Sequence, residues 1–251
     1  GVYWKPVYKI LECPDMKVWI VNARHIKYVP GHKTDKKDSA WICKLLLAGL
    51  LKPSYIPERE QRELRDLTRY RNKLIQHVSS EKNRIVRILE DCNIKLSSVV
   101  CSLDGVVANK LIDMLIDKGH VTMDDITCIY HKKLEASPEL LYQACEGFIE
   151  PHHIYMLQTI RKDMEQTKAI IADLTCRIKE VLSPYENVME LLQKIPGLSR
   201  KTVEDLIAEI GVDMEAFPTE KHLASWAGVC PEKKKRENKK KVVEPPMATN
   251  S

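Results

Sequence analysis

Hydrophobic residues recur at three- and four-residue steps over two long stretches of the chain, which is the spacing of one face of an α-helix. The first stretch runs from Glu58 to about Cys92, behind Pro57. Its apolar positions are Leu64, Leu67, Leu74, Val78, Ile85, Ile88 and Leu89. The second stretch begins at Pro151 and ends at Pro184. The pattern therefore predicts two long helices.

The second stretch alternates steps of three and four without a break, which is the heptad pattern of a coiled coil. The residues of this seam are Leu157, Ile160, Met164, Thr167, Ile171, Leu174, Ile178 and Val181. A heptad seam packs either against a helix of the same chain or against a second copy. We expect a coiled-coil helix over residues 151–183 and a homo-oligomer formed through it.

Shorter elements are predicted on both sides of these helices. The β-rich run Lys17 to Asn22 predicts a strand, and with a helix over Val2 to Leu11 it indicates part of an α/β unit. Another helix is expected to begin at Thr34 or Asp35 and to stop at Gly49. Further helices are predicted over Val106–Lys118, Asp124–Glu135, Glu139–Glu146 and Val188–Lys194, from about Arg200 to Gly211, and up to Trp226. The predicted fold is mainly α, with a partial α/β domain.

Composition agrees with a helical globular protein. The chain is 44% hydrophobic and 30% charged, with only nine Gly. No run approaches the roughly 18 apolar residues of a membrane span, so we expect no membrane partner. The eight Cys are scattered without a Cys-x-x-Cys pair, which favours reduced thiols in a cytoplasmic protein.

The net charge of +5 arises mainly from the C-terminal tail, because residues 232–251 hold seven Lys or Arg and three Glu. The rest of the chain is nearly neutral, so attraction to a polyanion depends on local patches.

Two carboxylates open the helix predicted after His32, in the run His-Lys-Thr-Asp-Lys-Lys-Asp that ends at Asp38. Asp35 and Asp38 are three residues apart and share a face, so both could bind one hard cation such as Mg²⁺. Acids in a first helical turn are also favourable through the helix dipole alone, which is the simpler interpretation.

A second candidate is the turn at Pro196-Gly197, which resembles the hairpin of a helix-hairpin-helix motif. A Gly turn before a helix presents free backbone N–H groups that suit a phosphate. Ser199, Arg200 and Lys201 lie beside Gly197. The alternative is an ordinary turn with Ser199 as the N-cap.

A third candidate is the basic face of the first long helix. Acids are interleaved with its nine Arg and Lys, which is typical of a solvated face. Between Glu63 and Val78, however, few acids oppose the bases, and this segment is a candidate nucleic-acid track. Its bases are Arg65, Arg69, Arg71 and Lys73.

Two blocks of short motifs lie in order at the two ends of the chain. The first block comprises Gly1-Val2-Tyr3-Trp4, the run Val18 to Asn22, the run Val29 to Asp38, and Leu50-Leu51-Lys52-Pro53. The second comprises Ile195-Pro196-Gly197, Ala208-Glu209-Ile210-Gly211, Phe217-Pro218 and the run Leu223 to Pro231. Together with the helical middle, these blocks resemble the transposases of the "insertion sequence one-ten" family over Gly1 to Pro231.

The resemblance implies a RuvC-like, RNase-H-type domain with an Asp-Glu-Asp-Asp tetrad for Mg²⁺, a coiled coil, and a C-terminal transposase domain with a nucleophilic Ser. Asp35 and Asp38 align with the last two acids of the tetrad. The family resemblance further implies a recombinase that cuts and rejoins DNA with a structured guide RNA. On this basis we expect DNA and RNA as partners, Mg²⁺ as the cofactor, and a cytoplasmic, nucleoid-associated location.

Two departures from the family pattern predict a catalytically incomplete fragment. The tetrad's Glu and first Asp are expected upstream of Gly1. The nucleophilic Ser is expected a few residues after Pro231, where this chain reads Glu-Lys-Lys-Lys-Arg-Glu-Asn-Lys-Lys-Lys and has no Ser before Ser251. A back-translation of Lys241 to Ser251, shifted by two bases, reads Ser-Ser-Arg-Thr-Thr-His-Gly-Asn-Lys-Phe. This string resembles the family's usual continuation and indicates a frameshifted, disordered tail.

The expected organisation has five parts. They are a partial RuvC-like domain (1–57), a basic long helix with a helical middle (58–150), a coiled-coil helix (151–183), a C-terminal transposase domain (184–231) and a Lys-rich tail (232–251). The alternative to a transposase is a non-catalytic module for nucleic-acid binding and oligomerisation. A RuvC-like junction nuclease is a third reading, and it leaves the C-terminal motif block unexplained.

Overall fold

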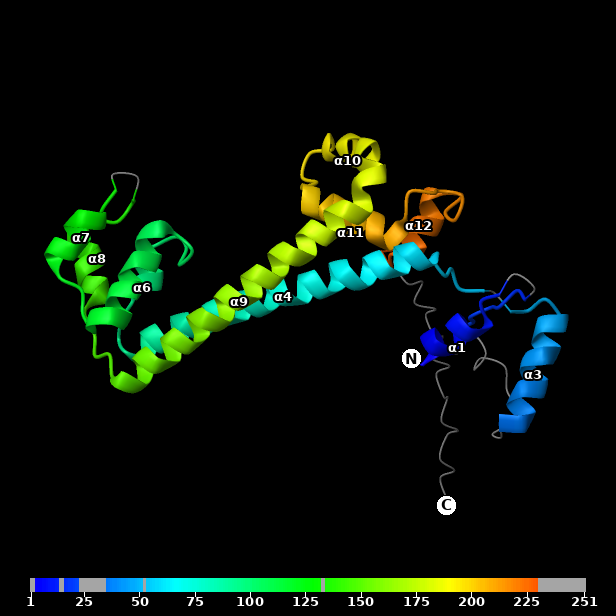
Figure 1. Ribbon diagram of the computed structural model, residues 1–251, viewed down its shortest axis with the longest axis horizontal. Helices are drawn as coiled ribbons and strands as arrows, with labels where there is room; N and C mark the ends of the chain where they lie inside the picture. Colours follow the sequence, from blue (N-terminus) through cyan, green and yellow to red (C-terminus); the bar gives the residue numbers. More distant parts are fainter. Residues whose placement is uncertain (1–2, 14–15, 23–34, 52, 132–133, 230–251) are drawn as a thin grey trace, which may run out of the picture. The chain divides into compact units, whose positions relative to one another are not determined.

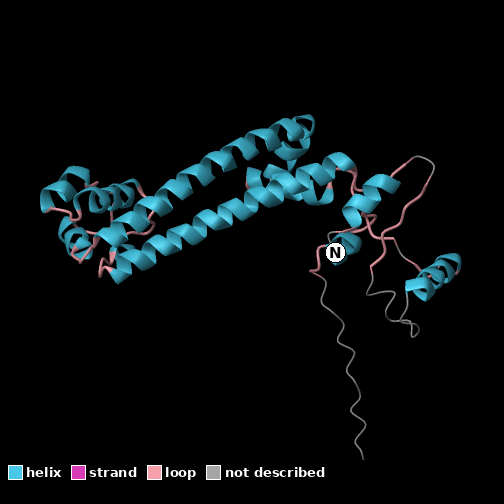
Figure 2. Ribbon diagram, turned by 60° about the horizontal axis from the view of Figure 1, so that its bottom comes forward, coloured by secondary structure: helices cyan, strands magenta, loops and turns pink. Residues whose placement is uncertain are grey.

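The computed structural model describes residues 3–13, 16–22, 35–51, 53–131 and 134–229, and of residues 35–38 it describes the backbone only. The chain divides into two units, residues 1–212 and residues 213–251. Helices dominate the described residues of the first unit, and the described part of the second contains a short helix (Figures 1 and 2).

The two long predicted helices are confirmed. They are α4 (Arg59–Asp91) and α9 (Pro151–Leu182), which lie side by side and antiparallel in Figures 1 and 2. His77 Nε2 lies 2.7 Å from Asp163 Oδ2, and farther along the pair His153 lies 3.4 Å from Asp91. The order of these contacts fixes the antiparallel register.

The heptad seam of α9 packs within the chain. Five of its eight predicted residues are buried: Leu157, Ile160, Met164, Thr167 and Ile178. They face α4 and the helices that pack with it. The partner of the seam is thus α4, and a homo-oligomer through the same seam would have to displace α4.

Four short helices follow α4 and pack against its C-terminal end and the start of α9. They are α5 (Leu96–Val99), α6 (Val106–Lys118), α7 (Met123–Ile129) and α8 (Pro138–Cys145). Helix α6 matches its prediction, α5 was not predicted, and α7 ends earlier than predicted. The early end of α7 has a local cause, because Tyr130 adopts an extended conformation.

Beyond α9 the chain turns back toward the first half of α4. The turn is a 3₁₀-helix, η1 (Ser183–Tyr185), followed by α10 (Glu186–Gln193) and α11 (Arg200–Ile210). Helix α11 packs on α4. The shared core consists of Leu64, Ile178, Leu182, Met189, Val203, Ile207 and Ala208. The predicted pair of helices around Pro196-Gly197 is therefore present.

The N-terminal segment contains α1 (Trp4–Leu11) and α3 (Asp35–Leu47), both as predicted. The strand prediction for Lys17 to Asn22 is wrong for the described residues. This run makes one isolated antiparallel bridge, between Val21 and Pro53, and the Ser54 N–H donates to the Ile20 carbonyl at 2.7 Å. A strand needs a neighbour along several residues, and here the pairing stops after one. The sheet of the expected α/β domain is thus not formed by the described residues.

In the second unit, α12 (Glu220–Trp226) confirms the last predicted helix. Phe217 is buried and meets Trp226 edge to face, with ring centroids 5.7 Å apart. The predicted tail, residues 232–251, lies outside the described residues. Among the helices described, none has the length and apolar character that crossing a membrane requires.

Candidate functional site

Three of the four predicted track bases hold α11 on α4. The Arg65 guanidinium donates to the Ala208 carbonyl at 3.0 Å and also to the carbonyl of Glu209. Arg69 donates two hydrogen bonds to the Glu209 carboxylate, 2.7 and 2.8 Å long. Both cations thus lie at the C-terminal end of α11, where the helix dipole is negative and favours positive charge.

Arg71 lies deepest in this interface, with 2% of its side chain exposed. Its Nη1 donates to Glu204 Oε2 at 2.5 Å, and its Nη2 donates to Asp205 Oδ1 at 3.1 Å. The side chain is thus buried against two acids, and nucleic-acid binding by Arg71 stays a prediction that this packing does not favour. Only Lys73 of the four remains exposed without a recorded ion pair in the described part of the chain.

The pKa values of the interface follow from these contacts. Burial acts to raise the pKa of Asp205, but hydrogen bonds from Lys201, Asn72 and Arg71 outweigh it and the pKa is lowered. The hydrogen bonds to Glu209 raise the pKa of Arg69. Burial lowers the pKa of Arg65, with the charge of Glu209 opposing it. The contacts thus favour the charged forms of Asp205 and Arg69.

A turn at Gly197 joins α10 to α11 at the place of the predicted hairpin, and most of the polar groups there are engaged within the chain. Gly197 adopts a φ of +88°, a conformation that favours glycine. Ser199 is the N-cap of α11, and its Oγ accepts from the Thr202 N–H at 3.2 Å. Arg200 donates two bonds to Glu186, at 2.7 and 2.9 Å, and these lower the pKa of Glu186. The Ser199 cap agrees with the ordinary-turn interpretation.

Lys201 completes the link between hairpin and long helix. Its Nζ donates to Asp205 Oδ2 at 2.9 Å and to the side chain of Asn72. A phosphate at the hairpin would therefore compete with protein groups for both Arg200 and Lys201.

The two predicted metal ligands lie in the first turn of α3, three residues apart. The side chains of Asp35 and Asp38 lie outside the described residues. Within the described part, no cluster of three or more His, Cys, Asp or Glu is arranged to hold a metal. Two carboxylates fit the chemistry of Mg²⁺, which commonly takes one or two protein carboxylates and completes its shell with water and substrate phosphates.

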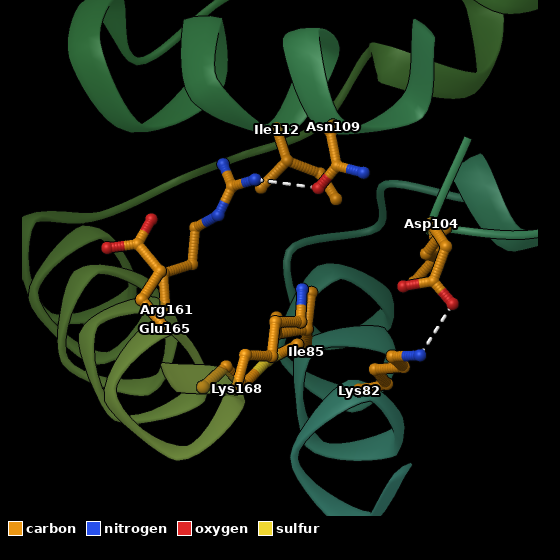
Figure 3. A pocket seen from close by; sticks show the side chains of 10 residues that line it. Lys82, Ile85, Asp104, Asn109, Ile112, Arg161, Glu165 and Lys168 are labelled. Atoms are coloured by element: carbon orange, nitrogen blue, oxygen red, sulfur yellow. Dashed lines mark hydrogen bonds and ion pairs between the residues drawn. The ribbon is translucent and has the colours of Figure 1, made fainter. Parts of the chain in front are cut away.

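A cavity of about 60 Å³ that the sequence did not predict lies between α4, α6 and α9 (Figure 3). Lys82 Nζ lies 2.5 Å from Asp104 Oδ2, and Arg161 donates to Asn109 Oδ1 at 2.7 Å and to Asp113. Three cations line the cavity. Lys82 and Arg161 bind the groups just named, and the third cation is Lys168. The volume suits about two water molecules.

Comparison with known families identifies both ends of the chain. A model of DEDD transposases of the IS110 type matches residues 1–94, and a model described as "Transposase IS116/IS110/IS902 family" matches residues 189–241. No curated protein and no solved structure matches the chain. The first match contains Asp35, Asp38 and the arginines of α4, and the second contains the hairpin and α11. Because the two matches agree in family and order and together span more than half of the 251 residues, the chain belongs to the IS110 family of insertion-sequence transposases.

Proposed function

We propose that the chain serves DNA transposition through a Mg²⁺ site that includes Asp35 and Asp38, with a structured RNA guide that selects the DNA. The observation that carries the proposal is the position of these acids, in one helical turn inside the first family match. The RNA guide and the RuvC-like fold are carried over from the family resemblance. Nucleoid association would follow from DNA binding.

The roles of the residues follow from their chemistry. Asp35 and Asp38 would supply carboxylate oxygens three residues apart on one face of α3. A bound Mg²⁺ would stabilise charge on the phosphate under attack. The α4–α11 ion pairs would hold the second matched region against the first, so that both act on one DNA molecule.

We further propose that this chain does not cleave DNA by itself. The residues directly after Pro231 are Glu and Lys where the family resemblance places a nucleophilic Ser. Without that hydroxyl, no covalent protein–DNA intermediate forms at this position.

Two measurements test the proposal. Mn²⁺ binding, followed by electron paramagnetic resonance, should weaken in Asp35→Asn/Asp38→Asn and stay unchanged in the control Asp173→Asn. Incubation of the full chain with Mg²⁺ and DNA should give no adduct on a denaturing gel. Equal Mn²⁺ affinity in all variants would refute the proposed metal site. A covalent adduct would refute the proposal that the chain does not cleave DNA.

The second candidate function is a non-catalytic nucleic-acid-binding module. The observation that favours it is the exposed basic side of α4, because binding requires neither the metal site nor the Ser. Removing Arg65, Arg69 and Arg71 is a poor test of this function, since their loss would also undock α11. A test needs bases that the fold does not use.

A further inference from the structure

Residues 67–89 of α4 have an unusually one-sided charge. The segment contains six bases and a single acid, Glu81, which is only 5% exposed. The bases are Arg69, Arg71, Lys73, Lys82, Arg84 and Arg87. Every exposed side chain of this segment is basic or uncharged.

The structure separates these bases into two groups. Arg69 and Arg71 bind acids of α11, and Lys82 binds Asp104. The fold thus uses three of the six.

The other three are Lys73, Arg84 and Arg87, and all are exposed. Arg84 lies 3.6 Å from Glu81, the longest ion pair recorded in the described chain. No ion pair of Lys73 or Arg87 is recorded among the described residues. Lys73 and Arg87 are therefore available to a partner, and Arg84 is held only by this long pair.

The available bases lie along one line. Lys73, Gln76, Ser80, Arg84 and Arg87 follow one another at steps of three or four residues, so they share a face of the helix. The buried residues Val78, Ile85 and Leu89 belong to the opposite side. At 1.5 Å per residue the line from Lys73 to Arg87 is about 21 Å long. We call these five residues the α4 stripe.

A solvated helix face normally mixes acids and bases, which pair at steps of three or four. The α4 stripe contains no acid. Across the helix pair, Asp163 of α9 is bound by His77, which is not part of the stripe. Three cations lie in line, and only Arg84 has an acid near it, the buried Glu81; this arrangement suits a polyanion.

We propose that the α4 stripe is a track for the phosphodiester backbone of a nucleic acid. Its length of about 21 Å corresponds to about six base pairs of B-form DNA, at 3.4 Å per pair. The inference takes its partner class from the proposed function but depends neither on the metal site nor on cleavage.

The test compares two triple variants of the full chain. The first is Lys73→Ala/Arg84→Ala/Arg87→Ala. The matched control removes three bases elsewhere, all exposed: Lys110→Ala/Arg177→Ala/Lys179→Ala. The probes are a 20-base-pair DNA duplex, an RNA hairpin and polyglutamate, and fluorescence anisotropy gives the Kd over a series of salt concentrations.

The stripe variant should bind nucleic acid at least about tenfold more weakly at 0.1 M salt, and the slope of log K against log salt should fall by about 2.7, or 0.9 for each lost contact. The control should change the slope by less than one. Comparison of the duplex with the hairpin tells which nucleic acid uses the track. Equal losses in both triple variants, no loss in the stripe variant, or equally tight binding of polyglutamate would each overturn the proposal.

A fold check keeps these results interpretable. Circular dichroism should give the stripe variant a Tm close to that of the unchanged chain, because its three side chains are exposed and only Arg84 has an ion pair, the long one with Glu81. If that variant unfolds, Arg84→Lys/Arg87→Lys supplies the second test. It preserves the charge and should preserve the salt slope, and a collapse of the slope in this variant would refute a backbone track.

Discussion

Replacing Arg71 by Met should release α11 from α4. Arg71 and Glu204 are each 2% exposed, and the bond between them is 2.5 Å long. Met keeps much of the side-chain volume but leaves the Glu204 carboxylate buried, with Arg200 Nε at 3.5 Å as its remaining ion-pair contact in the described chain. Removing one partner of a buried pair costs about 3–5 kcal/mol. We expect about 3 kcal/mol, since Arg200 compensates in part.

Hydrogen exchange measured by mass spectrometry reports this loss of stability for each helix separately. At about 1.4 kcal/mol per tenfold, amides of α11 should exchange on the order of a hundredfold faster in Arg71→Met. Amides of α6 should be unaffected, because α6 belongs to the other hydrophobic cluster of the unit. They are the internal control for global unfolding.

The double variant Arg71→Met/Glu204→Met distinguishes two effects. One is the cost of a buried carboxylate without its partner, and the other is the loss of the ion pair itself. With both charges gone, no buried carboxylate is left alone, and Asp205 keeps Lys201 and Asn72. Exchange of α11 should therefore return most of the way to the original rate. The reasoning is refuted if Arg71→Met speeds exchange less than tenfold, or if the double variant exchanges as fast as the single one.

Two further predictions concern the helices next to the C-terminal end of α4. In Gly147→Ala the new Cβ would lie 2.3 Å from the Cys92 carbonyl oxygen, so urea denaturation should show a loss of about 2–3 kcal/mol; an unchanged midpoint would contradict the clash. Hydrogen bonds from Lys118 and Thr122 lower the pKa of Asp125 to about 2. Because this is below its ordinary value of 3.8, charged Asp125 stabilises the fold above about pH 4, and the contribution is lost as pH falls toward 2. An NMR titration of this carboxyl should have its midpoint near 2 and should move upward in Lys118→Ala; a midpoint near 3.8 in the unchanged chain would refute the bonding.

The long helices could be predicted because hydrophobic periodicity states which face of a helix is buried. Periodicity does not state what covers that face. The seam of α9 was correctly located, yet its partner proved to be α4, which lies far away in the sequence. Periodicity also did not predict where α7 ends. The helix stops at Ile129 because the next residue is extended.

The position of the candidate site could be predicted from the sequence, but the pairing of its charged side chains could not. Counting charges near Arg71 shows few acids in its own segment, whereas its acids, Glu204 and Asp205, come from α11. A charge count along the sequence does not include acids that are distant in the sequence and come close only in the folded chain. The signal was present in the acidic face of α11, which could have been matched to the basic face of α4.

The antiparallel pair of α4 and α9 also constrains how the length of such a chain can change. Both helices run between the same two hydrophobic clusters, so a deletion in one alone would pull a cluster out of register. Removing one heptad from each would keep every seam residue on its face and shorten the pair by about 10.5 Å. The pair thus behaves as an adjustable spacer, whose length changes in matched steps of seven residues.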